Sequence, residues 1–198
     1  MNLSSDANSV TLSAAAPVLV PGLNVPYMAF SPGAICTPFS DLGSEASSAD
    51  LVYLFPVTVT RATPITDMGL YLGGSSTGSI RLGIYDSHPD TGEPRNRLAQ
   101  TEFTFSAQNW EWQNPITPAI DLEPGVYWIA YHMSTGTMTY KSIPINRLHN
   151  IGMYDEGYQC TGIAKVLTYA SGLPNPWVPA FGDYIESTAP FCWFINTP

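Results

Sequence analysis

Residues 121–133 read D-L-E-P-G-V-Y-W-I-A-Y-H-M, and this stretch decides the fold class. Glu123, Pro124 and Gly125 predict a tight turn, because proline presets one backbone angle and glycine accepts a positive one. The residues after the turn form the longest β-favouring run in the chain. One face of that strand would carry Tyr127, Ile129, Tyr131 and Met133, and the other Val126, Trp128, Ala130 and His132. Neither face is clearly polar, so the run predicts a central strand covered on both sides.

From residue 50 onward, short β-favouring runs alternate with turn residues, as in a β-sandwich or barrel. Residues 65–72 and 79–85 predict a hairpin, with Met68, Leu70 and Leu72 on one face of the first strand and Ile80, Leu82 and Ile84 inward on the second. Pro56 indicates an edge strand or a bulge, and Pro115 and Pro118 predict interruptions. No run predicts a helix. The expected fold is therefore all-β, a jelly-roll-like antiparallel β-sandwich.

Residues 1–49 differ from the rest because they are rich in Ser, Ala and Pro and show no regular period. Their recurring prolines exclude a long helix and a central strand. The sequence thus predicts an extended arm over residues 1–49 and a β-sandwich domain over residues 50–198. Such an arm can lie along another chain or along its own domain, and its composition also suits a disordered tail. Its apolar anchors would be Val18, Leu19, Val20, Leu23, Tyr27, Met28 and Phe30.

Charged residues make up 12% of the chain, the formal net charge is −9, and no basic cluster is present. Nucleic-acid affinity depends largely on cations that neutralise phosphates, so nucleic acid and anionic membranes are disfavoured as partners. No apolar run reaches the roughly 20 residues that a membrane helix needs. Membrane insertion is therefore not expected. The first basic residue is Arg61, so an ordinary signal peptide is not expected either.

Three widely spaced cysteines argue against a disulfide framework and against a zinc knuckle. Cys36, Cys160 and Cys192 are interpreted as buried free thiols, with a bridge between Cys160 and Cys192 as the alternative. The chain is therefore expected to fold in a reducing compartment.

Carboxylates and histidines offer few candidate sites. Asp86, Asp90 and Glu93 could present oxygens to a calcium ion, but they lack the spacing of an EF-hand, and a solvated turn is the preferred interpretation. The histidines show no zinc spacing, and His132 is predicted to be a packed or hydrogen-bonded strand residue. The chain contains no G-x-S-x-G elbow, P-loop or Rossmann fingerprint. The sequence thus predicts neither a cofactor nor enzymatic activity.

Two tryptophans are the best candidates for a ligand contact. Trp110 and Trp112 would share one face of a strand near a turn. Exposed, they would form a platform on which a sugar ring stacks; buried, they would be core, which is the favoured interpretation. Trp177, in a proline-rich loop, is predicted to lie at the surface or at a subunit contact.

Three segments carry a resemblance to a known group. They read P-V-T-V-T-R-A-T-P-I-T-D-M-G-L at residues 56–70, S-I-R-L-G-I-Y-D at residues 79–86 and L-E-P-G-V-Y-W-I-A at residues 122–130. Together they resemble a β-sandwich module of tailed-bacteriophage virions, found there in tail fibres, tail tips and head-decorating proteins. The similarity covers residues 50–143 and does not include the arm. It implies a non-enzymatic structural protein, often a homotrimer, assembled in the host cytoplasm with other virion subunits.

The leading hypothesis is therefore a small virion subunit, either a tail-fibre or tip protein or a capsid decoration, held by its arm. No heptad run or long repetitive shaft is present, so the chain alone does not form a long fibre. A carbohydrate-binding module that recognises host surface glycans is the alternative, and it requires exposed Trp110 and Trp112. A glycan hydrolase is the third hypothesis, and it requires two convergent carboxylates in a cleft.

Overall fold

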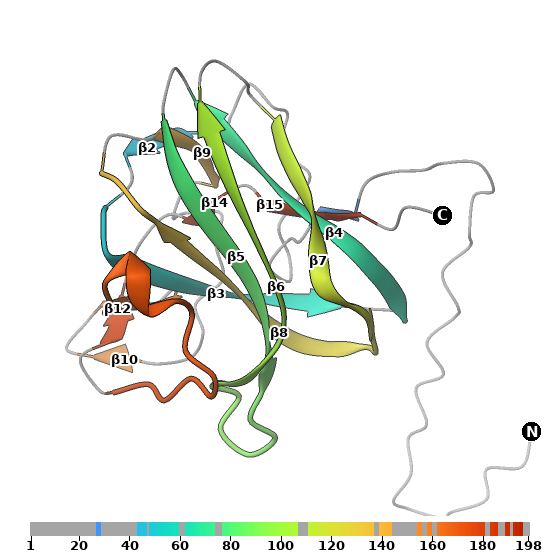
Figure 1. Ribbon diagram of the computed structural model, residues 1–198. Helices are drawn as coiled ribbons and strands as arrows, with labels where there is room; N and C mark the ends of the chain where they lie inside the picture. The colour runs from blue at the N-terminus through green and yellow to red at the C-terminus, as the bar shows by residue number, and fades with distance from the viewer. Residues whose placement is uncertain are drawn as a thin grey trace, which may run out of the picture.

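The chain folds into antiparallel strands, as Figure 1 shows for the computed structural model. The long strands are β3 (Leu51–Val59), β4 (Thr63–Gly73), β5 (Thr77–Ser87), β6 (Pro94–Ser106), β7 (Glu111–Leu122), β8 (Gly125–Met133), β9 (Thr139–Ile143) and β12 (Gly162–Val166). The short ones are β1 (Tyr27–Met28), β2 (Gly43–Ala46), β10 (Tyr154–Asp155), β11 (Tyr158–Gln159), β13 (Tyr184–Ile185), β14 (Ala189–Pro190) and β15 (Cys192–Ile195). The structure describes residues 27–28, 43–46, 48–59, 62–73, 77–106, 111–136, 139–143, 154–155, 158–159, 162–180, 183–185, 189–190 and 192–195.

Within these residues helical backbone is confined to 3₁₀ turns, η3 (Tyr169–Ser171) and Asp183. The predicted all-β class is therefore confirmed, while the jelly-roll arrangement of the strands stays a prediction.

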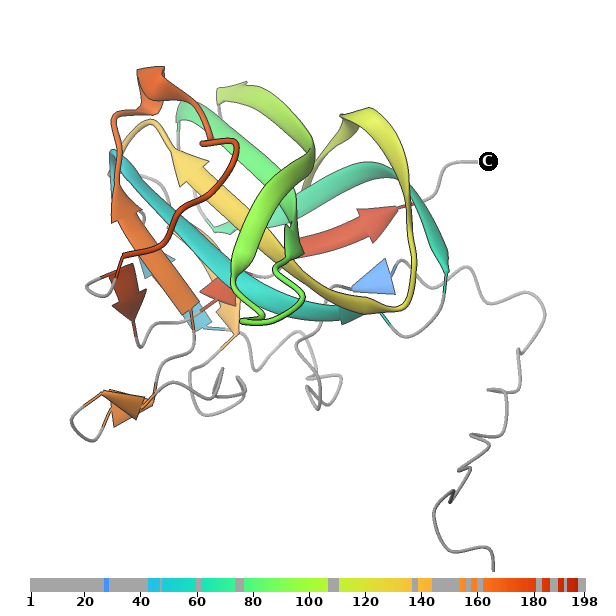
Figure 2. The same cartoon turned by 90° about the horizontal axis from the view of Figure 1, so that it is seen from below.

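One continuous path of pairing joins most strands, in the order β1-β15-β4-β7-β6-β5-β8-β3-β12-β13, with β9 pairing β4 and carrying β2 and β14. Among the described residues, β6 and β7 share one register pair, Gln100 with Thr117. The path curls over there, so that β4 and β7 share one core with β3, β5 and β8 (Figures 1 and 2). The result is a sandwich-like body with the core between two layers.

β8 lies between β3 and β5 and is paired with both along most of its length. Ile129, for example, lies opposite Phe55 of β3 and Ile84 of β5. Every residue of β8 from Trp128 to the end of the strand is buried. The prediction of a central strand covered on both sides is thus confirmed. The expected reason for the glycine is wrong, since Gly125 does not adopt a positive φ.

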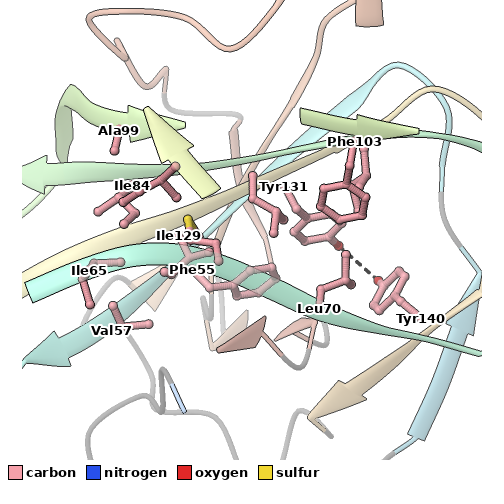
Figure 3. Close-up of a cluster of buried hydrophobic side chains, with 14 of the residues drawn as sticks. Phe55, Val57, Ile65, Leu70, Ile84, Ala99, Phe103, Ile129, Tyr131 and Tyr140 are labelled. Carbon is pink, nitrogen blue, oxygen red and sulfur yellow. Dashed lines mark hydrogen bonds between the residues drawn. The ribbon is translucent and has the colours of Figure 1, made fainter. Parts of the chain in front are cut away.

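The larger of two apolar cores fills the space between the layers (Figure 3). The side chains predicted to face inward on the second and third long strands are all buried there: Met68, Leu70, Leu72, Ile80, Leu82 and Ile84. On β8, the Tyr131 ring stacks on the Tyr53 ring with centroids 4.8 Å apart. Its hydroxyl lies 3.1 Å from the hydroxyl of Tyr140 on β9. Aromatic contacts therefore connect three strands inside this core.

β4 and β5 do not form the predicted hairpin. β4 pairs with β7, β9 and β15, whereas β5 pairs with β6 and β8. The two strands lie in opposite layers and bring their apolar faces together across the core. A hairpin and a crossing between layers bury the same alternate residues, so the periodicity that predicted the strands does not distinguish their pairing.

The prolines singled out in the sequence as edges, bulges or interruptions lie inside two strands, β3 and β7. β3 lies between β8 and β12 and is paired with β8 without a register shift, so the predicted edge strand or bulge is wrong. Pro56 itself lies beyond residues 51–54, the part of β3 that pairs with β12. β7 runs through Pro115 and Pro118, but its pairing with β4 is interrupted there, since the β4 partners jump from Ile120 to Pro115. The register between β7 and β4 shifts between Ile65 and Asp67, and this irregularity accommodates the prolines within the strand.

Two described segments of the arm pair with the domain. β1 pairs with β15, with Tyr27 opposite Phe194 and Met28 opposite Trp193. β2 pairs with β9 over all four of its residues. The remaining anchor candidates lie outside the described residues: Val18, Leu19, Val20, Leu23 and Phe30. The described parts of the arm thus act as strands added to the domain's own sheet.

Gly162 begins β12 at a point where a side chain has no room. A Cβ added there would lie 2.6 Å from the Leu54 carbonyl oxygen and 2.8 Å from the Phe55 ring. Gly162→Ala should therefore lower the free energy of unfolding by about 1–3 kcal/mol, measured by urea denaturation.

Gly125→Ala is the matched control, because a Cβ there meets its nearest neighbour at 3.6 Å, which is ordinary contact. It should change the free energy of unfolding by less than about 0.5 kcal/mol. Equal effects of the two substitutions would contradict the close approach of β12 to β3.

Candidate functional site

A segment with little regular structure, residues 167–180, covers the outer face of the sheet, the face that is turned away from the larger core. We call this segment the strap. Its Leu173 and Trp177 form a second apolar core with side chains of the sheet beneath: Val52, Leu54, Tyr85, Trp128, Ala130 and Ile163. The strap explains why both faces of β8 are buried, since it covers the face that the other layer does not reach.

Trp177 is the main apolar contact of the strap. Its side chain is only 3% exposed, and its ring meets Tyr85 edge to face with centroids 6.1 Å apart. The ammonium of Lys165 on β12 lies 5.9 Å from the Trp177 ring centroid. The prediction that Trp177 lies at the surface or at a subunit contact is therefore wrong. The proline-rich sequence around it indicates a loop correctly and gives no sign of the sheet beneath.

Hydrogen bonds hold the middle of the strap to β5 and β6. The Tyr85 hydroxyl donates to the Pro174 carbonyl at 2.6 Å, and the Trp177 amide donates to the Arg95 carbonyl at 2.6 Å. The Arg97 guanidinium donates to the Leu173 carbonyl. Burial raises the pKa of the Tyr85 phenol, so its hydroxyl stays protonated and remains a donor at neutral pH.

A polar group of side chains holds the amino-terminal end of the strap, and we call it the Tyr169 cluster. Its members are Asp50, Arg81, Glu102, His132 and Tyr169. Arg81 donates to Glu102 over 2.8 Å and also to the Tyr169 carbonyl, and the Tyr169 hydroxyl donates to Glu102 over 3.0 Å. The Arg81 guanidinium lies 4.0 Å from the centroid of the Tyr169 ring. The Tyr169 amide donates to the Asp50 carboxylate at 2.7 Å.

His132 lies at the bottom of this cluster. It is 0% exposed, its Nε2 is 3.0 Å from the Leu167 carbonyl oxygen, and its ring centroid is 4.9 Å from that of Tyr169. Its expected role as a packed or hydrogen-bonded strand residue is confirmed. Burial lowers the pKa of His132, and the positive charge of Arg81 lowers it further, while the hydrogen bond to Leu167 acts in the opposite direction.

The Tyr169 cluster brings together five segments of the chain: residue 50, β5, β6, β8 and the strap. Of its members only His132 is singled out by the sequence, because no spacing along the chain connects it with Arg81 or Tyr169. The cluster's hydrogen bonds are largely satisfied internally, and its charges partly compensate one another. Its chemistry is therefore that of attachment, holding the strap in place over the sheet.

The three carboxylates considered for calcium do not converge. The Asp86 carboxylate accepts hydrogen bonds from the Arg95 guanidinium and the Asn96 amide, both at 2.6 Å. Burial would raise the pKa of Asp86, but these hydrogen bonds outweigh it and hold the pKa below its usual value. The Asp90 side chain is 85% exposed, and Glu93 accepts a hydrogen bond from a threonine of its own loop. No group of three metal-ligating side chains occurs in the part of the chain that the structure describes.

Several candidate site residues lie outside the described residues or have side chains that are not described. Trp110 lies outside the described residues, as do Cys36 and Cys160. The backbone of Trp112 lies in β7 opposite Leu70, and Cys192 begins β15; of these two side chains nothing is described. The sugar-stacking platform and the states of the thiols thus stay predictions.

Comparison with known proteins adds no assignment: no family model and no curated protein matches this chain. Among the described residues, no helix is long and apolar enough to cross a membrane.

Tyr85→Phe tests the attachment of the strap. The substitution removes a hydroxyl and leaves the Pro174 carbonyl without its donor under the strap, so it should cost about 1–2 kcal/mol of unfolding free energy. Tyr127→Phe is the matched control, because its hydroxyl also donates to a carbonyl, that of Glu123, at an exposed position. It should cost less than about 0.5 kcal/mol. Urea denaturation of both variants checks this, and a Tyr85→Phe cost no larger than that of the control would contradict it.

Proposed function

We propose that this chain is a non-enzymatic structural subunit of a bacteriophage virion, a small tail-fibre, tail-tip or capsid-decoration protein. In this proposal the jelly-roll-like domain is displayed on the particle, and the amino-terminal arm docks on neighbouring subunits. The protein is assembled in the host cytoplasm as a homo-oligomer, in keeping with the trimers common in the group that it resembles.

The observation that carries the proposal is the backbone pairing of the arm. β1 adds a strand next to β15, and β2 adds one next to β9. A segment added to an open sheet edge binds through main-chain hydrogen bonds, which need no particular side chains and no charge. β1 and β2 use this mode on the chain's own sheet edges. In this proposal the residues before β1 use the same mode on the sheet edge of a neighbouring subunit.

The organisation of the domain supports the same proposal. Both faces of β8 are covered by the chain itself, so the domain forms its cores without a ligand. The charged groups of the Tyr169 cluster are engaged in attaching the strap. The resemblance of residues 50–143 to virion modules concerns β3 to β9, which are the strands that build the larger core.

The proposal predicts that the chain is a component of purified particles. Particles of the phage that encodes it, banded on a density gradient, should contain the chain in a fixed ratio to the major capsid protein, measured by quantitative mass spectrometry. Because few charged residues are present, attachment should resist a wash in 1 M salt, where screening acts within about 3 Å. A chain that is abundant in the lysate and missing from banded particles would contradict the proposal.

A truncation separates docking from folding. Removal of residues 1–26 leaves β1 and β2 in place, so the free energy of unfolding should stay within about 0.5 kcal/mol of the full chain. Incorporation into particles should nevertheless fall severalfold, because the docking segment is gone. Removal of residues 1–42 takes away β1 as well and should reduce incorporation at least as much. Normal incorporation of both truncated chains would show that the arm does not dock the subunit.

A further inference from the structure

His132 is held in one tautomer by the strap. The Leu167 carbonyl oxygen can only accept a hydrogen bond, so Nε2 of His132 must carry the proton and Nδ1 is the unprotonated nitrogen. Nδ1 is buried and has no hydrogen-bond partner among the described residues. A second proton on this ring would therefore sit on a buried nitrogen without an acceptor.

The charged surroundings do not provide an acceptor. The titratable groups that face His132 come from every element packed around it: Arg81 from β5, Glu102 from β6, Asp50 from the residues before β3, and Tyr169 from the strap. β3 itself contributes the apolar Val52 opposite His132. Both oxygens of Glu102 and one of Asp50 are already bonded to Arg81 or to Tyr169. Arg81 is the register partner of His132 and places a positive charge beside it.

Opening the strap would expose the His132 ring to water and so stabilise its protonated, charged form. The groups that cover the His132 ring are Leu167 and Tyr169, both of the strap. Apart from its 3₁₀ turn the strap has no regular structure, and separate hydrogen bonds, not a ladder of strand pairs, hold its backbone to the neighbouring segments. Segments outside the sheet ladders open at lower free-energy cost than core strands. Opening the strap alone leaves the larger core between the layers intact.

We propose that the Tyr169 cluster is an acid-sensitive switch: protonation of His132 releases the strap from the outer sheet and uncovers the apolar face beneath it. That face is made of Val52, Leu54, Tyr85, Trp128 and Ala130. The switch is independent of the virion proposal, since it rests on contacts within one chain.

The direction of the pH dependence follows from linkage. In the closed state the pKa of His132 is lowered from 6.5, whereas with the strap lifted the imidazole meets water and regains its ordinary pKa. The open state therefore binds more protons in the window below pH 6.5. Opening is independent of pH above this value, and below it the open population grows by up to about tenfold per pH unit until the closed state also binds the proton.

Hydrogen exchange followed by mass spectrometry tests the switch on the full chain. Protection of strap peptides, corrected for the intrinsic exchange rate, should be constant from pH 8 to about 6.5 and fall by up to about tenfold per pH unit below it. Peptides from β4 and β8 should keep their protection over the same range. His132→Gln retains an N–H donor and cannot take up a proton, so its strap should stay protected. The matched control is His88→Gln, at a histidine whose side chain is 41% exposed in a loop, and its strap should open as in the wild type.

Three results would overturn the proposal: a wild-type strap as protected at pH 5 as at pH 7.5, acid opening that persists in His132→Gln, or loss of strap and β4 protection together. Should His132→Gln fail to fold, nuclear magnetic resonance of the wild type provides the second measurement. A strap that opens in step with the titration of the His132 ring supports the switch. A strap that opens at a pH where the His132 ring does not titrate overturns it.

Discussion

The pairing of β8 with β3 on one side and β5 on the other is the constraint on which the described structure depends. Because side chains alternate along a strand, this one element supplies both apolar cores. Tyr131 and its neighbours on one face pack between the layers, and Trp128 and Ala130 on the other pack under the strap. A shift of one residue in register would exchange the two faces and place His132 in the larger core, so both cores fix the same register.

The strap turns an ordinary outer sheet face into a buried one. Burying a large apolar side chain contributes about 1.5–3 kcal/mol, and Trp177 and Leu173 both make such a contribution, against the entropy lost in ordering the segment. The Arg81–Glu102 ion pair, with the Glu102 side chain 47% exposed, adds little net stability. Its importance is positional, since it places Tyr169 over His132. The apolar contacts therefore contribute most of the stability of the strap, and the polar cluster fixes the position of its amino-terminal end.

The alternation of apolar and polar residues predicts where the strands lie and which side chains face inward, but it does not predict which strands pair. The two faces of residues 125–133 and the inward residues of β4 and β5 could be read directly, because burial follows the alternation of side chains. The β4–β5 hairpin was wrong, since alternation is the same whichever strand lies alongside. Trp177 was misplaced because its burial depends on a sheet that is remote in sequence. The Tyr169 cluster could not be assembled from the sequence for the same reason, although His132 was correctly predicted to be packed.

The central role of β8 is tested most directly by native-state hydrogen exchange of single amides at neutral pH, in increasing urea. The amides of Ile129, Ala130 and Tyr131 should exchange only through global unfolding, with a free energy equal to that from urea denaturation, while those of β12 exchange through smaller openings. If the β8 amides exchange at a lower free energy than those of β12, β8 is not the element on which the rest of the structure depends.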